Sequence, residues 1–311
     1  MKNAVFAALL CLAVCLCSCA GGAESSADIS AESSCEVSAE ESDEMSNLID
    51  SADSIISSLD YTNTGKMGDQ DGPAFAVYSN TGFSGAKCDI DFRSININTL
   101  YPDGRFINAY MFLGIDVYEG IWWQNCVDAG LVWSGTRGGW HLFYNMYEPY
   151  NEGTSTWYES SVILPANEVY TLSFELTDDN YALLSVVGAS SGITDTAVVE
   201  VKGALADGSN TAFLLNVAVD YPENTKLDSD GKHSEDFAAI TLASTDVGLY
   251  FKNCHISSLS LRTSDGYSAF TDGDIAARSI WPDKTNGFDY APISVGLFGA
   301  DEYVIDIDMN R

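Results

Sequence analysis

Basic residues are scarce in this 311-residue sequence. Lys and Arg together number 14, against 45 Asp and Glu, so the formal charge is -31. Proteins that bind nucleic acid need a basic face that contacts phosphates. We therefore expect that this protein does not bind nucleic acid. An anionic lipid surface is disfavoured for the same reason. The chain also has only three His, without the His and Cys spacing of a zinc site.

Long apolar runs are absent beyond the first twenty residues, so the sequence predicts no membrane-spanning segment. Residues 1–18 combine a basic start with an apolar stretch and small residues, as signal peptides do. At the end of this stretch, Leu16, Cys17, Ser18 and Cys19 resemble the lipobox of bacterial lipoproteins. This resemblance implies cleavage after Ser18 and a diacylglycerol on Cys19. Each buried methylene contributes ~0.8 kcal/mol, so such a lipid would hold a domain at a membrane.

The expected address is therefore the outer face of a cell membrane, with the lipid as the only membrane contact. Ordinary secretion, with cleavage near Ser18, is the alternative. Residues 19–59 are rich in Ser, Ala and acidic side chains and have no Lys or Arg, which is typical of a flexible tether. Apolar residues at helical spacing between Met45 and Leu59 predict a short amphipathic helix that closes this tether against the domain.

Residues 60–311 carry short apolar runs with a period of two, separated by Asp-Gly, Asn-Gly and similar turns. Alternating runs at residues 88–92, 169–176, 247–251, 259–261 and 305–309 predict half-buried strands. Each sheet must hide one apolar face, so this pattern predicts one all-β domain, an antiparallel β-sandwich.

Three segments resemble the concanavalin A-like, laminin-G-like jelly-roll family: residues 128–133 with 139–143, 168–174 with 181–187, and 246–251 with 256–261. The resemblance covers about residues 75–262. It implies a jelly-roll β-sandwich whose concave sheet often holds glycans. Residues 263–311 have no counterpart in it, and we expect them to supply extra strands or a cap.

Aromatic residues are concentrated midway along the chain, where five of the six Trp lie between Trp122 and Trp157. Flat rings stack on the C–H faces of sugars while amides and carboxylates bind the hydroxyls, so the cluster predicts a lectin-like carbohydrate-binding surface. Because neighbours on a strand face opposite sides, one of Trp122 and Trp123 should lie away from the core. The candidate residues are Trp122, Trp123, Gln124, Tyr144, Tyr147, Glu148 and Trp157. The competing interpretation is that most of these rings fill the core.

Two other functions remain open. One is a divergent glycoside hydrolase or polysaccharide lyase of the same fold, although the glucanase Glu-x-Asp-x-x-Glu pattern is absent. The pairs Asp89 with Asp91 and Asp306 with Asp308 each share a strand face, which more often means solvation than catalysis. The other is an adhesin or envelope scaffold that contacts protein.

No cofactor is expected, apart from a structural Ca²⁺ as an open alternative at Asp228 and Asp230, where a solvated acidic loop is favoured. The domain holds three Cys, namely Cys88, Cys126 and Cys254. An exported chain permits one disulfide among them, and buried free thiols are equally compatible with the sequence.

Overall fold

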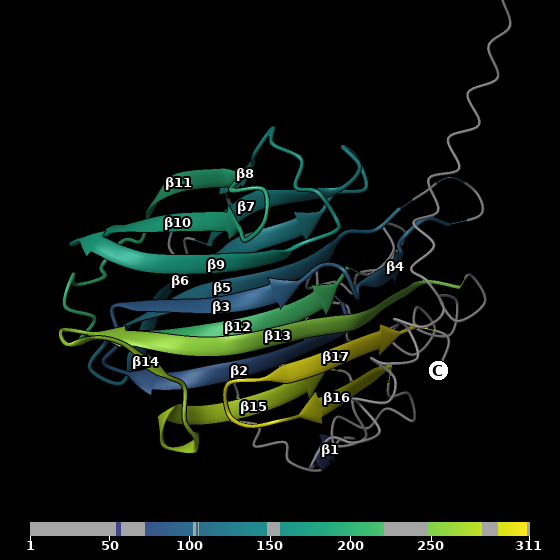
Figure 1. Cartoon of the computed structure of the whole chain (residues 1–311). Helices are drawn as coiled ribbons and strands as arrows, with labels where there is room; N and C mark the ends of the chain where they lie inside the picture. The colour runs from purple at the N-terminus through teal and green to yellow at the C-terminus, as the bar shows by residue number, and fades with distance from the viewer. Residues whose placement is uncertain are drawn as a thin grey trace, which may run out of the picture. The chain divides into compact units, whose positions relative to one another are not determined.

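A computed structural model of the chain describes residues 54–56, 72–101, 104, 106–147, 156–220, 248–281 and 292–309. These residues form two antiparallel sheets that lie over one another (Figure 1). The all-β sandwich predicted from the sequence is thereby confirmed. Among the described residues the only helical element is the 3-10 turn η1 (Asp272–Asp274).

The first sheet has ten strands. In spatial order the main path is β1 (Ser54–Ile56), β16 (Ile293–Leu297), β17 (Tyr303–Asp308), β13 (Tyr250–Thr263), β3 (Gly85–Asp91), β9 (Val169–Asp178), β10 (Tyr181–Gly188) and β11 (Thr194–Glu200). Two short strands, β4 (Asn96–Asn98) and β14 (Gly266–Ala269), also pair with β13. This long strand therefore joins several parts of the sheet.

The second sheet has seven strands. Their order is β15 (Ile275–Trp281), β2 (Ala74–Thr81), β12 (Thr211–Val219), β5 (Ala109–Glu119), β6 (Trp122–Trp133), β7 (Trp140–Tyr147) and β8 (Thr156–Glu159). Strands β5, β6, β7 and β8 follow one another in both sequence and space, because each is joined to the next by an antiparallel connection.

The core lies between the sheets and is rich in large rings. Trp140 of β7 is 1% exposed, and its ring centroid lies 5.7 Å from that of Phe251 on β13 of the opposite sheet. Phe92 contacts both Trp140 and the ring of Tyr170 on β9. For Trp140 the core-filling interpretation is therefore correct, since the indole is sealed between the layers.

Several predicted elements form as expected. Strands β6 and β7 pair through residues 126–133 and 140–147, and β9 and β10 form a hairpin closed by Asn180 with φ of 68°. The prediction of two strands within residues 246–261 is wrong, because β13 runs through as one strand. Asn253 and Ser258 both have φ of 56° beside register shifts, so the interruptions are β-bulges and not a turn.

The ends of the domain also differ from expectation. Within the predicted helix, residues 54–56 instead form β1, which pairs with β16 and is the edge strand of the first sheet. The strands therefore begin before residue 60, and the rest of that predicted helix lies outside the described residues. Residues after 263 supply the extra strands β14 to β17, which continue both sheets. In the described part of the chain no helix is long and apolar enough to cross a membrane.

Candidate functional site

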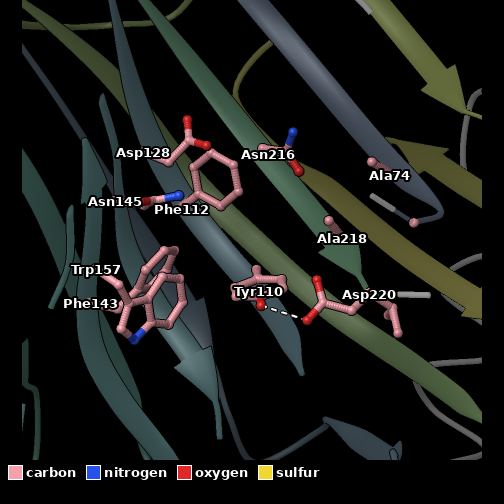
Figure 2. A pocket seen from close by; sticks show the side chains of 12 residues that line it. Ala74, Tyr110, Phe112, Asp128, Phe143, Asn145, Trp157, Asn216, Ala218 and Asp220 are labelled. Atoms are coloured by element: carbon pink, nitrogen blue, oxygen red, sulfur yellow. Dashed lines mark hydrogen bonds between the residues drawn. The ribbon is translucent and has the colours of Figure 1, made fainter. Parts of the chain in front are cut away.

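A pocket of about 200 Å³ opens on the outer face of the seven-stranded sheet. Trp140 faces the opposite sheet, so Phe143 and Asn145, at odd positions on the same strand, face outward. The strand register places two rows of outward residues next to each other. One row runs through Asn216, Phe112 and Phe143, and the other through Asp128, Asn145 and Trp157. The pocket is lined by Gly72, Ala74, Tyr110, Phe112, Asp128, Phe143, Asn145, Trp157, Asn216, Ala218, Val219 and Asp220. Figure 2 shows lining side chains from β2, β5, β6, β7, β8 and β12, together with Asp220 just after β12.

One side of the pocket is an aromatic wall. Trp157 stacks on Phe143 with ring centroids 5.1 Å apart and planes 26° from parallel (Figure 2). Tyr110 meets both rings, at 5.4 Å from Phe143 and 6.3 Å from Trp157. Phe143 is 2% exposed whereas Trp157 is 44% exposed. The wall therefore presents a supported indole to solvent.

Polar side chains lie beside this wall and across the pocket from it. Asn145 and Asn216 are 8% and 7% exposed, and neither Oδ1 atom has a hydrogen-bond partner within the described part of the chain. Asp128 lies directly across from Asn145 in the β6–β7 register. A buried acceptor without a donor is costly, which favours a ligand that donates hydrogen bonds here.

Tyr110, the tyrosine of the aromatic wall, is fixed by hydrogen bonds to its hydroxyl group. Tyr110 Oη donates to Asp220 Oδ2 at 2.7 Å, and Asn108 Nδ2 donates to Tyr110 Oη at 3.2 Å. Asn108 Oδ1 in turn accepts from the backbone N–H of Gly135 at 3.0 Å. This network ties the ring to the turn between β6 and β7, so that its orientation is set before a ligand arrives.

Two glycines, Gly130 and Gly114, pack closely against neighbours of the pocket lining. A Cβ on Gly130 would lie 2.5 Å from Phe112 Cα, a contact that backbone atoms cannot relieve without moving. A Cβ on Gly114 would lie 2.8 Å from Leu214 Cγ and 3.2 Å from Asp128 Oδ1. The absence of these two side chains gives Phe112 and Asp128 their room.

A second aromatic group lies at the hairpin between β5 and β6. Trp122 is 71% exposed and Trp123 is 44% exposed. Trp123 Nε1 donates to Asp116 Oδ1 at 3.2 Å, and Tyr118 Oη donates to Asp116 Oδ2 at 3.2 Å. The Asp116 carboxylate thus orients the rings of Trp123 and Tyr118.

The electrostatic character of this face is acidic. Burial, followed by the nearby Asp128 and Asp116 carboxylates, raises the pKa of the half-buried Cys126 thiol above its usual range. Burial and Asp116 raise the pKa of Tyr118 in the same way. Both groups are neutral at physiological pH, so the negative charge here resides on carboxylates.

The predicted site residues separate into four groups. Trp157 lines the pocket, while Trp122, Trp123 and the half-buried Gln124 lie at the hairpin. Tyr144 does not reach the pocket: it has the same facing as Trp140, and its ring stacks on Tyr158 at 4.9 Å. Glu148 and the side chain of Tyr147 lie outside the described residues, as do Cys19, Asp228 and Asp230.

The acidic pairs considered from the sequence have structural partners. Asp89 accepts from Thr171 Oγ1 at 2.6 Å, and Asp91 forms an ion pair with Arg93 at 2.6 Å. Asp306 accepts from the N–H of Asn253 at 2.8 Å, and Asp308 forms an ion pair with Lys252 at 2.6 Å. Asp306 and Asp308 are 8% and 9% exposed, so the solvated interpretation of this pair is wrong.

Of the described histidines, His255 lies with its Nε2 atom 2.8 Å from Glu302 Oε1, and His141 is buried. His141 is 1% exposed and its ring nitrogens lie 3.0 Å and 3.3 Å from the carbonyl oxygens of Ser160 and Gly138. Cys88, Cys126 and Cys254 are free thiols. Across the described ranges no three His, Cys, Asp or Glu side chains gather as a metal site.

Comparisons with known proteins concern the architecture alone. No family model and no curated protein matches the chain. Among solved structures, scytalido-glutamic peptidase with a transition state analogue inhibitor is 11% identical with a TM-score of 0.42, covering 78% of this chain and 100% of that one. The CBM2 module of Lactobacillus casei BL23 phage J-1 evolved Dit is 8% identical with a TM-score of 0.29, covering 54% and 82%. A Bacteroides ovatus mixed linkage glucan GH16 protein is 9% identical with a TM-score of 0.28, covering 50% and 70%.

Proposed function

We propose that this protein is an exported lipoprotein that binds a neutral glycan in the pocket on the outer face of the seven-stranded sheet. The observation that carries the proposal is the exposed Trp157 indole, stacked on Phe143, beside the buried amide oxygens of Asn145 and Asn216. An aromatic face and convergent hydrogen-bonding groups are the two parts of a sugar site.

The charge of the site favours a neutral sugar. Asp128 and Asp220 line the pocket, and its described lining contains no Lys, Arg or His. The whole chain carries a formal charge of -31. The negative charge of the protein would repel an anionic sugar and weaken its binding. The hydroxyl groups of a neutral sugar, in contrast, donate hydrogen bonds to carboxylate and amide oxygens.

Glycan binding is tested by titrating the purified domain with soluble neutral polysaccharides and following heat release. We expect binding to at least one, and Trp157→Ala to weaken it by about tenfold or more, as central aromatic residues do in binding sites. Tyr181→Ala is the matched control, since Tyr181 is 46% exposed on the other sheet. Binding to none of the polysaccharides, or equal losses in both variants, would contradict the proposal.

The hydrolase or lyase alternative is tested in the same samples. Release of reducing ends or of unsaturated sugars from a bound polysaccharide, lost in Asp128→Asn, would replace capture by catalysis. A binding protein leaves the polysaccharide at its original length.

The lipid anchor is a separate part of the proposal and is supported by the lipobox-like residues that end at Cys19. The full-length chain, expressed in bacteria, is expected to partition into detergent and to carry a lipid at its mature N-terminus. Cys19→Ala should move it to the aqueous phase. An unlipidated wild-type protein that starts near residue 19 would support ordinary secretion instead.

A further inference from the structure

The outer face of the seven-stranded sheet carries two aromatic groups, one at Trp157 and one at Trp123. Tyr110 and Phe112 of β5 line the pocket, and Asp116 has the same facing because it lies an even number of residues further along that strand. The indole of Trp123 donates to Asp116 and therefore lies on this same face. The two indoles thus belong to one continuous surface.

The separation of the two groups follows from the strand register. Trp157 pairs with Asn145, and Asn145 pairs with Asp128, so Trp157 lies two strands from β6. Trp123 lies five residues before Asp128 on β6. With about 4.8 Å between strands and about 3.3 Å per residue, the two indoles lie roughly 15–20 Å apart. A single sugar ring cannot reach both.

Two acidic side chains lie between the indoles. Asp128 and Cys126 are half-buried on β6, and Asp116 is 7% exposed on the neighbouring β5. Gly114, opposite Asp128, has no side chain to block the way. Carboxylate oxygens therefore follow the line that joins the two rings, as hydroxyl-rich ligands require.

We propose that the protein binds an internal segment of an extended neutral polysaccharide, with one sugar on Trp157 and another, several units away, on Trp123. This inference rests on the proposed function, because it assigns a ligand length to the same face. It adds a second contact site, Trp123 with Asp116 and Tyr118, to the pocket. Two linked contacts raise affinity because the second forms within the complex already made by the first.

The test compares oligosaccharides of increasing length with single-site variants. Wild-type protein is titrated with β-1,4-gluco-, β-1,4-manno- and β-1,3-gluco-oligosaccharides, each from the disaccharide to the hexasaccharide. We expect the hexasaccharide of the bound series to be at least about tenfold tighter than its disaccharide. Trp157→Ala should weaken both lengths, whereas Trp123→Ala should weaken only the long one and bring it close to the disaccharide.

A second measurement keeps the test independent of how Trp123→Ala folds. Trp123 is 44% exposed, so a bound hexasaccharide should protect its indole from hydroxyl-radical oxidation in wild-type protein, as measured by peptide mass spectrometry, and a disaccharide should not. Equal affinity at all lengths, or oxidation of Trp123 unaffected by the hexasaccharide, would overturn the extended-ligand inference. It would leave the proposed function standing, whereas failure of every oligosaccharide and polysaccharide to bind would end both.

Discussion

Trp157 lies on Phe143 almost ring to ring, with centroids 5.1 Å apart, although the two residues come from different strands. Phe143 is almost fully buried and Trp157 is nearly half exposed. The buried ring therefore sets the orientation of the exposed one. Within the aromatic wall, Trp157 is therefore the contact residue of the proposed site and Phe143 is its positioning residue.

Phe143→Leu should weaken glycan binding although Phe143 offers little surface to a ligand. Leucine keeps much of the buried volume, so we expect a stability loss on the order of 1 kcal/mol. The indole of Trp157 would lose its stacking partner and its fixed orientation. Binding and denaturant unfolding are measured on the same sample. Unchanged affinity at normal stability would show that Trp157 is positioned by other contacts.

Gly130→Ala should destabilise the domain because the new Cβ would lie 2.5 Å from Phe112 Cα and 2.6 Å from the carbonyl oxygen of Met111. Backbone atoms must move to relieve such contacts, at a cost of about 1–3 kcal/mol. Gly273→Ala is the matched control, since its Cβ would meet only Thr271 Oγ1, at 3.6 Å. Thermal melting of the two variants checks this prediction, and equal melting temperatures would contradict it.

Strands with clear alternation could be predicted from the sequence, and those interrupted by bulges could not. The β9–β10 hairpin has a period of two on both arms and a turn at Asn180, which accepts positive φ readily. In β13, Asn253 and Ser258 have the same kind of backbone conformation, but they insert bulges and the strand continues. The residue type alone does not distinguish these two uses.

The aromatic cluster was visible in the sequence, but its division between two faces was not. Tyr144 and Phe143 are neighbours, and only Phe143 faces the pocket, because the register of β7 with β6 decides which positions point outward. The polar residues Asn216 and Asp128 were missed for a related reason. Asp128 is the only charged residue of β6, and Asn216 stands between apolar neighbours in β12, and these were the available signals.

Asp128→Asn should reduce discrimination against anionic glycans. The carboxylate of Asp128 lines the pocket, and an amide keeps hydrogen-bonding capacity while removing one negative charge. Wild-type protein is expected to bind a neutral oligosaccharide and to exclude a uronic acid oligomer of equal length. In the variant, the ratio of the affinity for the neutral oligomer to the affinity for the uronic acid oligomer should fall by about tenfold. Asp265→Asn, in the exposed turn before β14, is the control, and the same narrowing there would indicate a long-range charge effect instead.

Glu168 provides a prediction for stability in acid. Its carboxylate accepts hydrogen bonds from the side chain of Ser191 and from the N–H groups of Ser191 and Ser190, and these lower its pKa from the usual 4.5 to about 2. The ionised form is therefore favoured in the folded state. The resulting stabilisation is fully present above about pH 4.5 and is lost as the pH falls toward 2. Glu168→Gln cannot ionise, so its unfolding free energy should be lower at neutral pH and should fall less than that of the wild type across this window. Urea unfolding at several pH values measures both effects, with Glu119→Gln at an exposed strand end as the control. If the two variants show the same acid dependence as the wild type, the hydrogen bonds to Glu168 do not contribute to acid stability in the way that its lowered pKa implies.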